Sequence, residues 1–171
     1  DLTSIIKLNG ADMVTIDGSN SGSASRNMTI INTNTAVSGN AVLWLASASA
    51  SDGASNNIIK NCIITGNGST TTLMGIFSGG TASVSTTENA RAINSGNIIQ
   101  NNKISKSRYG IYVIGINTDT LSTGLKIIEN VLGSSTAGDG FLIGGVDVKY
   151  QLGADISDNE VQNITGAADT T

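Results

Sequence analysis

The chain has 171 residues, a net charge of −4 and a sequence pI near 4.5, and this acidic balance without a basic stripe argues against nucleic acid as a partner. Ser, Thr, Asn and Gly fill 80 positions, yet Ile is the commonest residue and only 13% of residues are charged, which favours a folded β protein over a disordered one. The absence of His excludes a Ser-His-Asp triad, a His general base and a His-ligated zinc site, and the single Cys62 excludes an intrachain disulfide.

One domain spanning residues 1–171 is the expectation at this length. The chain begins at Asp1 and has neither an initiator Met nor a basic leader, so we interpret it as a segment of a longer chain whose neighbouring domains are among its partners. No apolar run approaches the roughly 18 residues of a membrane-spanning helix, and membrane insertion is not expected.

A six-residue pattern, Ile-x-x-Asn-x-apolar, recurs along the chain. A weak copy lies at 29–34, and clear copies lie at 58–63, 99–104, 127–132 and 156–161. The Asn positions are 29, 41, 28 and 29 residues apart, so three of the four intervals agree within one residue. A fixed period of this length predicts a repeat architecture.

Each repeat of about 29 residues contains short apolar runs between Gly, Asn and Ser turns, without sustained helical periodicity. Besides the Ile-containing runs, strands are expected at 41–44, 75–77, 110–113 and 140–143, and strict alternation is clearest at 146–152. Repeats that cannot bury their own apolar face coil so that each turn pairs with the next. The pattern therefore predicts an all-β parallel β-helix solenoid of about six turns.

The recurring Asn has a physical reason in this architecture. Asn tolerates the left-handed conformation at a bend between strands, and its amide both donates and accepts, so Asn side chains on neighbouring turns about 4.8 Å apart can form a hydrogen-bonded ladder. The expected ladder consists of Asn32, Asn61, Asn102, Asn130 and Asn159. An inner column of Ile58, Ile99, Ile127 and Ile156 should accompany it. The alternative is that Asn recurs only because the chain is rich in it.

Residues 97–112, with the pieces Asn-Ile-Ile, Asn-x-Ile and Tyr-Gly-Ile-Tyr, resemble the repeat of right-handed parallel β-helix proteins, the pectin-lyase-like family. Residues 8–18 and 28–35 are similar to segments of large secreted bacterial surface proteins built on such helices. The resemblance implies a right-handed solenoid and an extracellular or cell-surface location. It implies little about function, because lyases, hydrolases, epimerases, adhesins and plain stalks share the repeat.

The longest interval, between Asn61 and Asn102, points to loop insertions that enlarge one turn. Residues 66–72 and 78–95 account for the excess, and both are expected to bulge from the rod. The second insertion carries Glu88 and Arg91, which makes it the candidate binding loop for a glycan or other surface ligand. Trp44 is a weaker candidate: if Leu43 and Leu45 point inward, it points outward as a platform for a sugar ring.

An acidic cluster at Glu129, Asp155, Asp158 and Glu160 is the other candidate site. Polysaccharide lyases of the family that the chain resembles bind calcium through clustered carboxylates and use Arg or Lys as base, so calcium is the one cofactor considered. The more economical interpretation is a solvated surface on which Lys126 lies above Asp155. The hydrolases of this fold need a Gly-His-Gly motif, which a chain without His lacks.

No residue is assigned a catalytic or metal-binding role from the sequence. The favoured function is a non-catalytic structural or adhesin-like β-helix module of a secreted or cell-surface protein. The alternatives are a polysaccharide lyase-like domain and a carbohydrate-binding β-helix domain.

Overall fold

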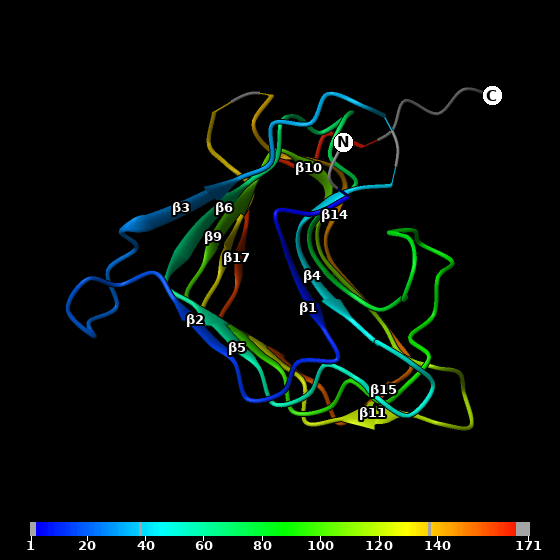
Figure 1. The fold of residues 1–171 in the computed structure, drawn as a ribbon. Coiled ribbons are helices and arrows are strands. Elements are labelled where there is room, and N and C mark those ends of the chain that lie inside the picture. The colour runs from blue at the N-terminus through cyan, green and yellow to red at the C-terminus, as the bar shows by residue number, and fades with distance from the viewer. Residues whose placement is uncertain (1–2, 38, 137, 167–171) are drawn as a thin grey trace.

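A computed structural model describes residues 3–37, 39–136 and 138–166, and all regular structure within these ranges is β-strand. Because the described residues contain no helix, none of them forms a helical membrane span. Fifteen strands form three five-stranded parallel sheets, which enclose a core on three sides (Figure 1).

The three sheets are defined by their strands in spatial order. The first sheet contains β1 (Ile6–Asn9), β4 (Ala41–Ala46), β7 (Met74–Ser78), β10 (Ser107–Ile114) and β14 (Phe141–Lys149). The second contains β2 (Thr15–Asp17), β5 (Ile58–Lys60), β8 (Ile98–Gln100), β12 (Lys126–Ile128) and β16 (Asp155–Ser157). The third contains β3 (Met28–Ile31), β6 (Cys62–Thr65), β9 (Lys103–Ser105), β13 (Val131–Leu132) and β17 (Glu160–Val161). A short pair, β11 (Ser122–Thr123) and β15 (Gln151–Leu152), lies between the first and second sheets.

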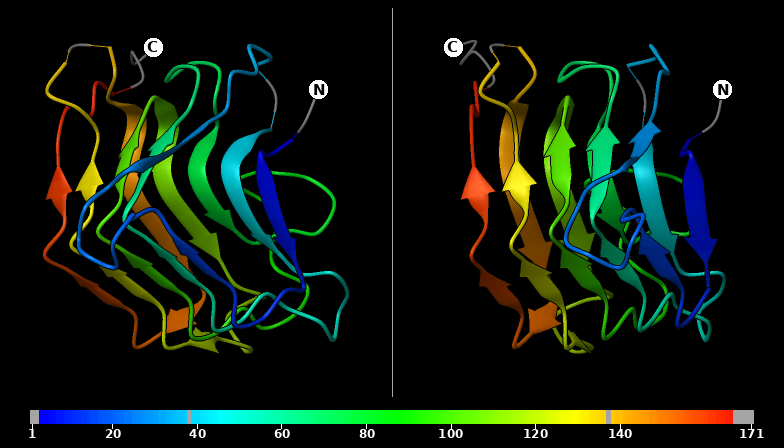
Figure 2. Two further views of the ribbon diagram at one scale, coloured as in Figure 1. Left: turned by 60° about the vertical axis from the view of Figure 1, so that its left-hand side comes forward. Right: turned by 90° about the vertical axis from the view of Figure 1, so that its left-hand side faces the viewer.

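The chain passes through the first, second and third sheets in turn, and each pass pairs in parallel with the next (Figure 2). This is an arrangement like that of a parallel β-helix. The described residues complete five passes, where the sequence period predicts about six turns. Aligned residues of the second sheet, from Ile16 to Ile156, are 43, 40, 28 and 29 positions apart, so only the last two intervals have the expected length.

Apolar columns run through the core because equivalent residues of successive strands lie in register. The second sheet stacks five isoleucines: Ile16, Ile59, Ile99, Ile127 and Ile156. The three internal members are at most 1% exposed, whereas Ile156 in the last strand is 47% exposed. β-branched side chains suit such columns because they are rigid and pack well on a pleated surface.

Cys62 holds the second position of the expected Asn column, one residue after the predicted Asn61. The side-chain oxygens of Asn102, Asn130 and Asn159 each accept a hydrogen bond from the backbone N–H of the preceding turn, and the donor to Asn102 is Cys62 at 3.0 Å. Asn61 therefore lies outside this column, and Ile59 rather than Ile58 belongs to the Ile column. The doublets Ile58-Ile59 and Asn101-Asn102 make the two alignments equally good in sequence.

Asn32 is also outside the ladder. It follows β3 instead of preceding it, and its side chain donates to the backbone oxygen of Ala41 at 2.7 Å, which closes the bend toward the first sheet. A second buried Asn pair lies at the entrance to the second sheet: Asn97 Oδ1 accepts from the backbone N and Nδ2 of Asn57 at 2.9 and 3.2 Å. The repeat pattern does not predict this pair.

The long insertion covers the sheet instead of bulging from it. Residues 79–92 fold over the outer side of β4, β7 and β10, where Trp44, Phe77 and Tyr112 lie side by side, each at most 1% exposed. The loop contributes the buried Val84, and its backbone accepts hydrogen bonds from Trp44 Nε1 and Tyr112 Oη, at Gly79 O (2.7 Å) and Thr86 O (2.9 Å). Trp44 points outward as expected, but beneath this cover it cannot stack on a sugar.

Candidate functional site

A column of left-handed residues forms the corner between the second and third sheets. Asn61, Asn101, Glu129 and Asp158 each follow the last residue of a second-sheet strand, with φ between 49° and 57°. This conformation turns the chain sharply toward the third sheet and leaves the four side chains on the outside of the corner. Asn adopts it readily, whereas Glu does so rarely, so Glu129 holds an uncommon conformation at an exposed position.

Residues 18–27 form a loop that is bound to this corner by its own polar groups. Arg26 donates to the backbone oxygen and Oδ1 of Asn101 at 2.8 and 2.5 Å, and Asn101 Nδ2 donates to Ala24 O at 2.8 Å. Gly18 permits the close approach, because a Cβ there would lie 2.2 Å from the backbone oxygen of Asn61. The loop is therefore packed against two turns of the stack.

Between the loop and the corner lies an open hollow of about 350 Å³, which we call the corner hollow. Six of its eight lining residues carry polar side chains, and the lining comprises Gly22, Ser23, Ala24, Lys60, Asn61, Gln100, Asn101 and Glu129. Two of these side chains are joined across adjacent turns, since Gln100 Nε2 donates to Glu129 Oε2 at 2.8 Å. The hollow thus presents amide, ammonium and carboxylate groups together.

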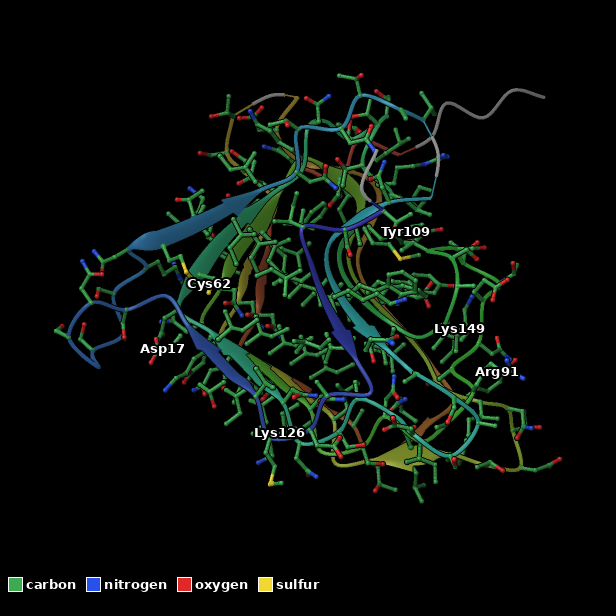
Figure 3. The ribbon with its side chains drawn as sticks, viewed as in Figure 1. Asp17, Cys62, Arg91, Tyr109, Lys126 and Lys149 are labelled. Carbon is green, nitrogen blue, oxygen red and sulfur yellow. The ribbon has the colours of Figure 1, made fainter. Side chains whose placement is uncertain are left out.

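Asp17 fixes one side of the hollow. Its carboxylate accepts from Asn61 Nδ2 at 2.8 Å and from the backbone N and Oγ of Ser19 at 2.9 and 2.8 Å, and it lies 3.2 Å from Lys60 Nζ. These hydrogen bonds, with that from Asn61 the largest contribution, hold the pKa of Asp17 well below its usual range. Asp17 is therefore a fixed anion that orients Asn61 and Lys60, and Figure 3 places it on the outside of this corner.

Beside Asp17, Cys62 begins the next strand and is fully buried. Burial, followed by the negative charge of Asp17, raises the pKa of its thiol to about 11. Cys62 fills the ladder position below Asn102, and it is not an ionised nucleophile at neutral pH.

The four predicted carboxylates do not gather at one point. Glu129 and Asp158 belong to the corner column, whereas Asp155 lies on the second sheet beside Lys126 and Glu160 on the third beside Val131. Local hydroxyl or amide groups bind three of them: Ser157 donates to Asp155, Gln162 to Glu160 and Gln100 to Glu129. Across the described ranges, no three Asp, Glu or Cys residues are placed to hold a metal ion.

The predicted binding loop keeps its two charged residues at the surface. Glu88 and Arg91 are both exposed, and within the described part of the chain neither side chain forms a hydrogen bond or ion pair. Arg91 and Lys149 lie on the loop side of the first sheet (Figure 3). Lys149 Nζ donates to Tyr112 Oη at 2.6 Å, and this hydrogen bond raises the pKa of Lys149. Arg91 and Lys149 are thus cations beside the aromatic side chains that residues 79–92 cover.

Sequence reasoning identified Asn61 and Glu129 for other reasons and missed their neighbours in the hollow. Lys60 and Gln100 each end a second-sheet strand, and Asn101 follows Gln100 as the first half of an Asn doublet. The signal that was available is the polar pair after each Ile-Ile run, at 60–61 and 100–101. The contribution of Arg26 had no sequence signal, because 75 residues separate it from Asn101.

Comparison of the chain with family models, curated proteins and solved structures gives no match. The class that the structure defines is an all-β protein of parallel strands in stacked sheets, similar to a parallel β-helix. Inferences about activity therefore rest on the geometry of the chain itself.

Proposed function

We propose that the chain is a non-catalytic structural module, a right-handed β-helix solenoid of the pectin-lyase-like kind, in a secreted or cell-surface protein. The observation that carries the proposal is the continuous column from Cys62 through Asn102 and Asn130 to Asn159, in which side chains join one turn to the next. A buried polar column of this kind fixes the register of the turns, which suits a structural module of fixed length and shape.

The rival proposal, a lyase-like enzyme, needs a general base whose pKa lies near the working pH. On the loop side of the first sheet the pKa values of Lys149 and Tyr109 move away from that range. The hydrogen bond to Tyr112 raises the pKa of Lys149, and burial raises that of Tyr109. Burial lowers the pKa of Lys7, but its ammonium donates to Thr81 O at 2.7 Å and lies 3.8 Å from the centre of the Trp44 ring. These contacts support a structural role for the face.

The enzymatic alternative is tested with acidic glycans. The purified chain is incubated with polygalacturonate and with other uronate polymers, with and without calcium, and unsaturated products and new reducing ends are measured. The proposal predicts no release above that of buffer alone. Calcium-dependent release that Asp158→Asn abolishes, with Asp119→Asn as the control, would overturn it in favour of a lyase.

The corner hollow supports a second, compatible role in binding a neutral glycan. Gln100, Asn101 and Glu129 supply donors and acceptors of the kind that pair with sugar hydroxyls, and the charge of Lys60 is already paired with Asp17 at 3.2 Å. Because Lys60 is paired with Asp17, the carboxylate of Glu129 disfavours a polyanion and a neutral ligand suits the hollow better. The Asp17 contacts and the packed loop hold these groups in place before a ligand binds.

An array of neutral and acidic glycans tests this role. Gln100→Ala should abolish binding of the glycans that the parent chain retains, because it removes a donor from the hollow and its bond to Glu129. Gln162→Ala is the matched control, since Gln162 also donates to a Glu, here Glu160 two residues earlier, but lies outside the hollow. Equal loss in both variants, or retention of acidic glycans alone, would contradict a neutral-glycan site in the corner hollow.

A further inference from the structure

Two Asn-Gly dipeptides occur in the chain, Asn9-Gly10 and Asn67-Gly68. In such a pair the backbone nitrogen of Gly can attack the side-chain carbonyl carbon of Asn and close a five-membered succinimide ring. The attack is least hindered before Gly, because every other residue places a Cβ beside the attacking nitrogen. Ring closure also requires that the Gly N–H is free and that the peptide can rotate toward the Asn side chain. The two pairs differ in both respects.

Strand pairing holds the first pair in place. Asn9 is the last residue of β1 and lies in register with Ala46 of β4. The N–H of Gly10 donates to the backbone oxygen of Ala46 at 2.9 Å, and Gly10 adopts a left-handed conformation with a φ of 67°. The attacking nitrogen is thus engaged and its peptide is fixed. Ring closure at Asn9 therefore requires that this end of β1 first separate from β4.

The second pair lies in the loop at residues 66–72, between β6 and β7. Asn67 is exposed, and among the described residues no acceptor binds the N–H of Gly68. The Asn67 side chain is held through Nδ2 alone, which donates to Thr71 Oγ1 at 3.1 Å on the exposed side of the loop. Both reacting groups are therefore accessible without the separation of any strand.

We propose that Asn67 is a site of spontaneous deamidation in the folded protein and that Asn9 is protected from it. The nitrogen of Gly68 bonds to Cγ of Asn67, the Cγ–Nδ2 bond breaks, and Nδ2 leaves as ammonia with the proton that Gly68 loses. Water then opens the succinimide at one of its two carbonyl carbons. Opening at Cγ gives an aspartate at this position, and opening at the backbone carbonyl carbon gives an isoaspartate.

The conversion changes the charge and the backbone of the loop and leaves the core intact. The new carboxylate makes the net charge one unit more negative than −4. An isoaspartate routes the main chain through Cβ, and either product loses the bond from Nδ2 to Thr71 Oγ1. Because Asn67 is exposed in a loop outside the strands, the fold tolerates both changes. The modified forms therefore accumulate in the folded protein.

Peptide mapping by mass spectrometry tests the proposal on the 171-residue chain. The chain is aged in mildly alkaline buffer, folded in one sample and unfolded by urea in the other, and isoaspartate is identified by enzymatic methylation. Both pairs should convert in urea. In the folded sample Asn67 should convert, and Asn9 should convert at least about tenfold more slowly. Conversion of Asn67 in urea alone, or equal rates at the two sites in the folded sample, would overturn the proposal.

Loop variants test whether the nitrogen of Gly68 is the attacking group. Gly68→Ala should slow the conversion of Asn67 about tenfold, because it places a Cβ beside that nitrogen. The fold accommodates this Cβ, whose nearest neighbour would be the side-chain atom Thr71 Oγ1 at 3.3 Å. Ser69→Ala is the matched control in the same loop and should convert at the parent rate. Equal rates for Gly68→Ala and Ser69→Ala would contradict the proposed reaction.

Asn67→Gln separates ring closure from direct hydrolysis of an exposed amide. The variant keeps the amide at the surface, but its longer side chain would have to close a six-membered ring, which forms far more slowly. Anion-exchange chromatography of the aged, folded variant should therefore lack the main acidic form that the parent chain develops. An acidic form that appears equally in Asn67→Gln and in the parent would place the reaction elsewhere and overturn the assignment to Asn67.

Discussion

Asn130 joins two turns of the stack through a single side-chain oxygen. Its Oδ1 accepts from the backbone N and from Nδ2 of Asn102, at 2.9 and 3.1 Å. Asn130 makes the same two bonds to Oδ1 of Asn159, at 3.0 and 2.9 Å. Both Asn102 and Asn130 are at most 1% exposed, so these bonds add to the strand pairing where water cannot replace them.

Asn130→Ala should lower the free energy of unfolding by about 1–3 kcal/mol, because it leaves the buried backbone N–H of Asn102 without its acceptor. Thermal and urea unfolding followed by circular dichroism measure the loss. Asn67→Ala is the matched control, since Asn67 is exposed and its amide bonds only Thr71 Oγ1, at 3.1 Å. Equal losses in the two variants would remove the energetic role of the column.

Val84→Ser should destabilise the fold by about 2 kcal/mol, because it removes buried apolar surface from the cover over the first sheet. Trp44 is the single tryptophan and lies beneath this cover, so its fluorescence should shift to the red and become accessible to a quencher. Ala82→Ser makes a similar polar change at an exposed position of the same loop and should alter neither property. Unchanged Trp44 emission in Val84→Ser would contradict the covering role of residues 79–92.

The pH dependence of stability should change in Asp17→Asn. The pKa of Asp17 is lowered in the folded protein, so its contribution is present above the unfolded value of about 3.9 and is lost as pH falls through the folded value. The parent chain should therefore melt at a higher temperature than the variant at pH 7, and the difference should shrink in strong acid. A difference in melting temperature that grows with acidification would show that folding does not lower the pKa of Asp17.

Cys62 should resist thiol reagents in the folded protein. With a pKa of about 11, only about one thiol in a thousand is ionised at pH 8, and the side chain is buried. Labelling by a disulfide reagent should follow the rate of unfolding and accelerate with urea. Rapid labelling without denaturant would place Cys62 at the surface and outside the Asn column.

Much of the fold could be predicted from the sequence because residues that stack in register recur at a regular spacing along the chain. The spacing of Asn102, Asn130 and Asn159 equals one turn of the structure. The predicted register is wrong at Asn61, because the adjacent Ile and Asn doublets allow two alignments that differ by one residue. The prediction is also wrong at Asn32, because the first turns are longer than the later ones. The same difference in length explains why about six turns were predicted where the structure completes five passes.

The candidate site was less predictable because it depends on loops that return to the stack. Arg26 reaches Asn101 across 75 positions, and no local pattern records such a contact. The same reason applies to residues 79–92: their length indicates an insertion, but the apolar face beneath them is visible only once Trp44, Phe77 and Tyr112 are aligned. The sequence period predicts the repeating strands and the Asn column, whereas the corner hollow depends on a loop that does not repeat.

Side-chain oxygens of one Asn column join neighbouring turns in this register. The most direct test of this column is the scalar coupling that nuclear magnetic resonance detects across a hydrogen bond, between the backbone nitrogen of Asn102 and the side-chain carbonyl carbon of Asn130. We predict a measurable coupling for this pair, with a second from Asn130 to Asn159 and a third from Cys62 to Asn102. A coupling from Asn102 to a different carbonyl, or none together with rapid exchange of its amide proton, would contradict the stacked column and the register built on it.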